Sequence, residues 1–219
     1  MCFSNLLALL LEERKARDVE EKSAWHADHA AQTGDTDKYM ELLAEGVRHA
    51  SKQDWPRAAR SCRAAMSLRP DEPMAYYNLG AALGNSGHHV EAAQRFLEAK
   101  ERYAVGSEDW AKATADAFDM LRHKECGEVA KPEWWNDEGL KALSARVVRM
   151  VPNEVETNRM RAYVLCGQGG AWEVGARSAA ELREAATHYD RTAALCDAPA
   201  GKAEFAHNAG WCRHQADVM

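Results

Sequence analysis

Long hydrophobic runs are missing from this sequence of 219 residues. Its most apolar segment, LLALLL at residues 6–11, is far shorter than the roughly 20 residues that a membrane-spanning helix requires. No lysine or arginine precedes it, and the charged EERKARD follows where a secretory signal would carry small residues. We therefore expect a soluble intracellular protein, located in the cytoplasm, that does not insert into membranes.

An excess of positive charge is missing as well. The chain has 28 lysine and arginine residues against 34 aspartate and glutamate residues, and its formal net charge is -6. Proteins that bind nucleic acid neutralise phosphate groups with clustered basic side chains. The charge balance therefore predicts no nucleic-acid partner.

Paired cysteine motifs are absent too. The 6 cysteines are spread from Cys2 to Cys212, and no CxxC occurs. Isolated cysteines on helical segments usually pack as small apolar side chains. We expect free thiols in a reducing compartment, with neither a disulfide framework nor a zinc site.

Sustained alternation of β-branched residues does not occur, whereas alanine-rich amphipathic runs with breaks at proline and glycine recur. The segment YMELLAEGVRHASKQDWPRAARSCRAAMSLRP (39–70) aligns with PMAYYNLGAALGNSGHHVEAAQRFLEAKERYA (73–104) at an offset of 34 positions, which places Gly46 on Gly80 and Ala58 on Ala92. This pattern resembles the tetratricopeptide repeat (TPR) family, whose unit is a pair of antiparallel helices. The resemblance implies that Gly80 and Ala92 face each other where the two helices cross.

The glycine-rich stretch NLGAALGNSGHHVEAA (78–93) could instead suggest a phosphate loop or a metal site. A phosphate loop needs a preceding strand and a following lysine, and neither is present. The adjacent His88 and His89 point to different faces of a helix, which disfavours a metal pair. The resemblance explains these glycines through helix packing and the turn between helices.

The resemblance extends along the chain and implies an all-α, right-handed α-solenoid of antiparallel helix pairs, with enlarged turns in the third and fourth repeats. We expect an N-terminal capping helix and linker over residues 1–38 and a repeat domain over residues 39–219. The predicted repeats are residues 39–72, 73–106, 107–154 and 155–199, followed by a half repeat at 200–219. Ser178-x-x-Glu181 predicts the start of the second helix of the fourth repeat.

The TPR resemblance also implies a protein-interaction scaffold or adaptor that binds a peptide or helix of another protein in a concave groove. The residues that it places in the groove are Tyr77, Asn78, Ala81, Asn85, Lys112, Arg159 and Tyr163. Leu43, Val47 and Glu108 occupy positions at which one family subtype carries a clamp for carboxylates, so we do not expect that clamp. A structural subunit of a larger assembly and a regulatory fragment of a longer enzyme are the alternatives.

The enlarged turns contain KPEWWND and GGAWEVG. Tryptophan has a large apolar surface that must be buried against something. Trp134, Trp135 and Trp172 therefore either pack onto their own repeats or form an edge interface for a second protein.

Catalytic motifs are missing, since no G-x-S-x-G occurs and no nucleophile can be matched to a histidine and an acid. His26 and His29 lie one helical turn apart, but two ligands are too few for a structural zinc site. We expect no enzyme activity, no cofactor and no metal. Partner identity and oligomeric state remain open.

The apolar segment at residues 6–11 covers all sides of a helix, which disfavours exposure to solvent. We expect it to pack on a groove wall formed by Met40, Leu43 and Val47, or to bind a partner.

Overall fold

The computed structural model describes residues 35–167 and 171–219, and all regular structure in these ranges is helical. The predicted N-terminal capping helix and the apolar segment at residues 6–11 lie outside the described residues. The helices are α2 (Asp35–Ala50), α3 (Trp55–Leu68), α4 (Pro73–Asn85), α5 (His89–Arg102), α6 (Glu108–Leu121), the short 3-10 helix η1 (Lys124–Cys126), α7 (Asp137–Met150), α8 (Val155–Cys166), α9 (Ala179–Leu195) and α10 (Pro199–Asp217). None of the helices in the described part is long and apolar enough to span a membrane.

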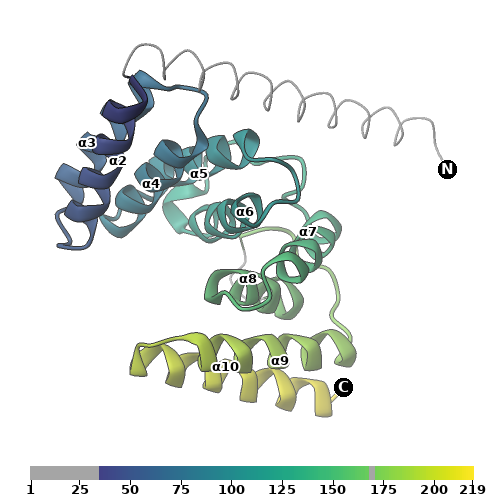
Figure 1. Cartoon of the computed structure of the whole chain (residues 1–219). Helices are drawn as coiled ribbons and strands as arrows, with labels where there is room; N and C mark the ends of the chain where they lie inside the picture. The colour runs from purple at the N-terminus through teal and green to yellow at the C-terminus, as the bar shows by residue number, and fades with distance from the viewer. Residues whose placement is uncertain (1–34, 168–170) are drawn as a thin grey trace, which may run out of the picture. The chain divides into compact units, whose positions relative to one another are not determined.

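The chain divides into two compact units, Met1–Ala113 (unit 1) and Thr114–Met219 (unit 2), with the boundary inside α6. In unit 1, contacts join α2 to α3, α3 to α4, and α4 to α5. In unit 2, they join α7 to α8, α8 to α9, and α9 to α10. The pairs α2–α3 and α9–α10 each lie side by side in antiparallel orientation (Figure 1). Sequential helices therefore pack as neighbours, as a helical repeat requires.

The helix starts in unit 1 keep the repeat offset of the sequence. Helix α3 begins at Trp55 and α5 begins 34 positions later at His89. The carboxylate of Asp54 accepts a hydrogen bond from the backbone N–H of Arg57 at 3.3 Å and caps α3. Before α5, Gly87 has a φ of 82°, a left-handed conformation that glycine adopts without strain. The cap at Asp54 and the turn at Gly87 thus fix where the second helix of each pair begins.

The helix crossing in the second pair is filled by an aromatic ring. A Cβ atom added to Gly80 would lie 3.0 Å from two atoms of the Phe96 ring, which are its nearest neighbours. Ala92 is fully buried in α5, but it is not among the three atoms nearest to Gly80. The predicted close approach at Gly80 therefore exists, and its main partner is Phe96. In the first pair, the Sγ of Cys62 lies 3.0 Å from the corresponding position on Gly46.

The proposed groove wall on α2 differs from the prediction at one residue. Leu43 is 4% exposed and packs in a core cluster with Tyr39, Ala65 and Ala75. Burial raises the pKa of Tyr39 to about 12. Leu43 is therefore part of the core, because it lies on the side of α2 that faces α3 and α4, and only Met40 and Val47 of the predicted wall are exposed.

The core of unit 2 lies between α8, α9 and α10. Tyr189 of α9 is fully buried, and its ring stacks on Phe205 of α10 with a centroid distance of 6.4 Å. Burial raises the pKa of the Tyr189 hydroxyl, which keeps it neutral. At the start of α9, Ser178 and Glu181 form the predicted capping box. The helix start is thereby fixed by its own sequence.

Candidate protein-binding surfaces

Helix α4 has one buried face and one accessible stripe in unit 1. Its buried residues are Ala75, Tyr76, Leu79, Gly80, Ala82 and Leu83. The predicted groove residues Tyr77, Asn78, Ala81 and Asn85 fall between them and are partly or fully exposed. Because residues three or four positions apart share a helix face, these four side chains form one stripe.

Helix α2 carries an equivalent stripe of exposed apolar residues. Met40 is 54% and Val47 56% exposed, and Met74 at the start of α4 is 48% exposed. Met40 precedes Met74 by the repeat offset, Val47 precedes Ala81 in the same way, and α2 contacts α4. We define the unit 1 surface as Met40, Val47, Met74, Tyr77, Asn78, Ala81 and Asn85. None of these side chains carries a charge.

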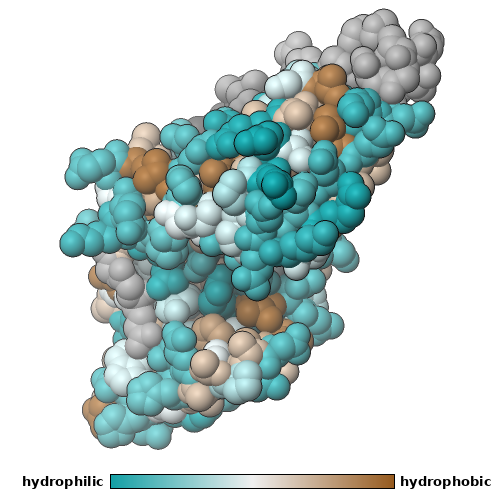
Figure 2. Space-filling model, turned by 90° about the vertical axis from the view of Figure 1, so that its left-hand side faces the viewer, coloured by the Kyte–Doolittle hydropathy of each residue, from teal (hydrophilic) through white to brown (hydrophobic). Residues whose placement is uncertain are grey.

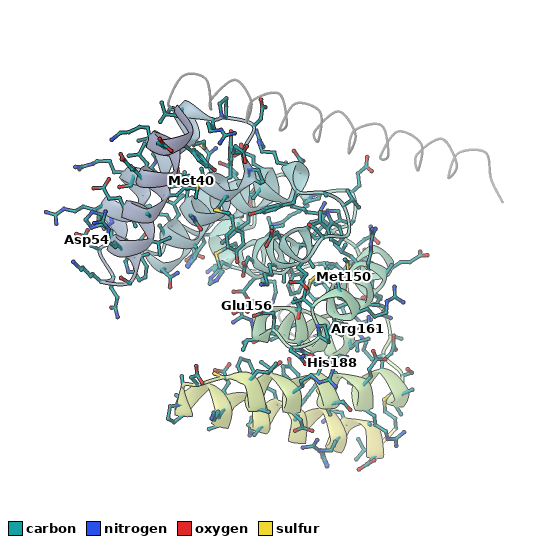
Figure 3. All side chains as sticks on the ribbon, viewed as in Figure 1. Met40, Asp54, Met150, Glu156, Arg161 and His188 are labelled. Carbon is teal, nitrogen blue, oxygen red and sulfur yellow. The ribbon has the colours of Figure 1, made fainter. Side chains whose placement is uncertain are left out.

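The figures show this setting. Met40 is labelled on α2 in Figure 3. In Figure 2, hydrophobic side chains form separate brown patches between hydrophilic ones on the face that is drawn.

Packing fixes part of the unit 1 surface in place. The ring of Tyr77 meets that of Phe96 edge-on at a centroid distance of 5.4 Å. The side-chain amide of Asn85 donates to the carbonyl of Ala81 at 2.8 Å, which satisfies one carbonyl at the end of α4. Lys112, on the part of α6 that belongs to unit 1, is half-buried.

In unit 2, the predicted groove residues Arg159 and Tyr163 lie on α8 beside charged residues of α6. Asp119 pairs with Arg159 at 3.1 Å and with Arg122 at 3.6 Å. The guanidinium of Arg122 lies over the ring of Tyr163, 3.5 Å from its centroid. The edge of Tyr163 also meets the buried ring of Tyr189 at 5.7 Å. We define the unit 2 surface as Asp119, Arg122, Arg159 and Tyr163.

The described parts of the two enlarged turns of unit 2, residues 122–136 and 171–178, meet in an aromatic cluster. Trp135 lies 5.7 Å from Trp134, 6.1 Å from Trp172 and 5.6 Å from Phe118, measured between ring centroids. The indole N–H of Trp135 donates to the carbonyl of Ala171 at 2.9 Å. Trp172 is 7% exposed, whereas Trp134 and Trp135 are half-buried. Trp172 is thus mainly a packing residue, and Trp134 and Trp135 keep accessible surface.

An ionic network holds this aromatic cluster against α7. Arg177 donates to Asp137 at 2.9 Å and to the carbonyl of Val164 at 3.0 Å. Trp172 also donates to Asp137, at 3.3 Å. The hydrogen bond from Arg177 holds the pKa of the Asp137 carboxyl well below its usual range. The two turns are therefore joined to each other and to the first turn of α7.

A second carboxylate extends the network to α9. Lys141 contacts Asp137 at 3.2 Å and Glu181 at 2.7 Å. Burial tends to raise the pKa of Glu181, but hydrogen bonds from Lys141 and Ser178 outweigh it and lower this pKa to about 2.

At the start of α7, a Cβ on Gly139 would lie 2.7 Å from the carbonyl oxygen of Trp134. Only glycine allows the tryptophan segment to approach α7 so closely.

The sequence analysis did not identify Asp119 and Arg122 as neighbours of Arg159 and Tyr163. Asp119 lies in the last turn of α6 and Arg122 directly follows this helix, and their separation of three positions is the spacing of a helical ion pair, which the sequence alone indicates. The contact of Arg122 with Tyr163 had no signal in the sequence, because it depends on how α6 and α8 pack.

Comparison with known proteins gives matches only among solved structures. No family model and no curated protein matches the chain. YrrB, described as a TPR protein with an unusual peptide-binding site, is similar with a TM-score of 0.54 and 16% sequence identity, covering 88% of this chain and 84% of YrrB. PilF of Pseudomonas aeruginosa matches with a TM-score of 0.42 and 13% identity, covering 84% of this chain and 91% of PilF.

Proposed function

We propose that this chain, which has the TPR-like fold of an all-α solenoid, is an interaction scaffold that binds a peptide or helical segment of another protein. The observation that carries the proposal is the unit 1 surface, where Met40, Val47 and Met74 are each about half exposed. Several exposed large apolar side chains on neighbouring helices are typical of interaction sites. The peptide-binding site named for YrrB belongs to that protein, and its likeness to this chain concerns the fold.

The chemistry of the unit 1 surface suits an apolar segment. Methionine side chains are flexible and polarisable, so they adapt to different apolar partners. Tyr77 offers an aromatic ring whose orientation Phe96 already sets, which lowers the entropy lost on binding. The amide of Asn78 can donate to and accept from the backbone of a bound segment.

The unit 2 surface suits a polar part of a partner. Arg159 and Tyr163 are residue types that often dominate binding energy. Both are held by Asp119 and Arg122 rather than being free to rotate. We propose that each unit contributes one contact area, with apolar character in unit 1 and charged character in unit 2.

The test is affinity purification from the native source with mass spectrometry, using the parent chain and the variants Met40→Glu and Met74→Glu. Each variant places a charge on the unit 1 surface, and we expect loss of specific partners with unchanged helicity. Val90→Glu is the matched control, because Val90 is 36% exposed on the second-helix side of the pair. Retention of every partner by both methionine variants would refute the proposal.

The alternative of a permanent structural subunit predicts a different outcome in the same experiment. The chain would then elute only in one large complex of fixed composition, and the isolated chain would aggregate. A monomeric isolated chain that captures partners reversibly supports the scaffold.

A further inference from the structure

A buried histidine of unit 2 lies at the junction of α7, α8 and α9. The side chain of His188, on α9, is 13% exposed, and its Nδ1 lies 2.9 Å from the Oδ1 of Asn158 on α8. Asn158 is fully buried. Its amide nitrogen donates to the carbonyls of Pro152 and Glu154, each at 2.8 Å, so Asn158 ties the turn before α8 to α9.

These contacts determine which nitrogen of the neutral His188 ring carries the proton. Flipping the Asn158 amide would place its oxygen against two carbonyl oxygens, so the amide orientation is determined. Its Oδ1 must therefore accept from His188, and the neutral ring carries its proton on Nδ1. The other nitrogen, Nε2, then has a lone pair and faces the Glu184 carboxylate at 3.8 Å.

The Glu184 carboxylate is already paired with a cation. Arg161 of α8 donates to it from two nitrogens, at 2.8 and 3.0 Å. The same guanidinium donates to the carbonyl of Lys141 and to the hydroxyl of Ser144, both on α7. Arg161 and His188 carry labels close together in Figure 3. Arg161 thus joins α8 to α9 through the Glu184 carboxylate, and α8 to α7 through the Lys141 carbonyl and the Ser144 hydroxyl.

We infer that His188 makes the α7–α8–α9 junction an acid-sensitive joint, in which protonation of Nε2 adds a second cation beside the largely buried Arg161, while the one carboxylate between them, Glu184, is partly exposed. The charged groups that face His188 are Arg161 from α8, and Glu184 and Arg191 from α9 itself. On the other side of α9, α10 contributes Arg213, which pairs with Asp190 at 2.7 Å. Glu184 favours the protonated ring, whereas both arginines and the loss of solvent oppose it.

Burial lowers the pKa of His188 below its ordinary value of 6.5; Glu184 opposes this shift, and Arg161 and Arg191 add to it. The unfolded chain therefore takes up a proton at a higher pH than the folded chain does. The stability that the neutral His188 ring contributes to the folded chain is fully present above about pH 6.5. It is lost as the pH falls from there toward the lower pKa that His188 has in the folded chain. Within that window this one group can lower the folding equilibrium constant by at most about tenfold per pH unit.

The joint bears on the unit 2 surface, and this part of the inference rests on the proposed function. Asn158 and Arg161 lie on the same helix as Arg159 and Tyr163. Loosening the contact between α8 and α9 in acid would release Tyr163 from Tyr189 and move a binding residue. Binding through unit 2 should then weaken below about pH 6.

The test compares urea unfolding of the full chain between pH 5 and 8 for the parent and His188→Gln, which cannot ionise. We expect the parent to lose stability more steeply than the variant below pH 6.5. The matched control is His207→Gln, because His207 is exposed on α10 and lies outside the α7–α8–α9 junction.

A second measurement needs no variant. Proton–nitrogen correlation spectra of the imidazole rings in the parent chain should show His188 with its proton on Nδ1 at pH 7.5 and a titration midpoint below 6.5. A proton on Nε2, or a midpoint at or above 6.5, would overturn the inference even if His188→Gln fails to fold. These readouts involve no partner, so they can fail while the scaffold function stands, and the reverse is also true.

Discussion

Replacing Gly80 with alanine tests the helix crossing of the second pair. Two effects of opposite sign act at this position. Alanine is favoured over glycine inside a helix by about 1 kcal/mol. Against this, the new Cβ would lie 3.0 Å from the ring of Phe96, which is 4% exposed and has little room to move.

The sign of the net effect follows from the packing. Overfilling a close-packed site costs about 1 to 3 kcal/mol, which equals or exceeds the gain in helix propensity. We therefore expect Gly80→Ala to lower the free energy of unfolding by about 0 to 2 kcal/mol. Gly210 of α10 provides a matched control, since a Cβ there meets no atom within 4 Å. Gly210→Ala should gain about 1 kcal/mol in stability.

Urea unfolding followed by circular dichroism measures both variants against the parent chain. The prediction is a difference of about 1 to 3 kcal/mol between them, with Gly80→Ala the less stable. Adding Phe96→Leu to Gly80→Ala should remove much of the clash, so the double variant should be more stable than the two single changes predict. If Gly80→Ala is stabilised as much as Gly210→Ala, the proposed crossing is wrong.

Two further predictions concern the enlarged turns of unit 2. Trp135→Ala removes three ring contacts and the hydrogen bond to Ala171, so we expect it to lower the free energy of unfolding by about 3 kcal/mol, measured by thermal unfolding. Trp134→Ala should lower it by only about 1 kcal/mol, because the hydrogen bond from Trp135 to Ala171 is kept. Impaired partner capture by a stable Trp134→Ala chain would support the edge interface, and equal losses of stability in both variants would contradict this account of the cluster. The carboxyls of Asp137 and Glu181 have lowered pKa values, so the stability that they contribute is present above about pH 4.5 and is lost as the pH falls toward about 2. Arg177→Met, with Arg183→Met on the exposed side of α9 as control, should flatten this acid dependence, and an unchanged pH profile would refute the role of the ion pair.

The sequence by itself determined the helix pairs and several of the residues that start and cap the helices. The 34-residue offset places Trp55 and His89 at equivalent positions, and both begin a helix in the structure. Ser178 with Glu181 caps α9 as its spacing predicts, and Asn136 caps α7 by accepting from Gly139 at 2.9 Å. These features are local, because they depend on residues within a few positions of each other. The all-α, TPR-like fold class is confirmed by the helices of the described residues and by the structural likeness to YrrB.

Only the tertiary structure decided which side chains meet across helices. The rotation of α2 places Leu43 in the core and leaves Met40 exposed, although both are apolar and close in sequence. The arrangement of the two enlarged turns brings Arg177, just before α9, within hydrogen-bond distance of Asp137 at the start of α7. The packing of α8 on α9 decides that Asn158 orients His188. A repeat pattern specifies that helices pair, but contacts between distant residues depend on helix rotation and turn geometry, which no local periodicity records.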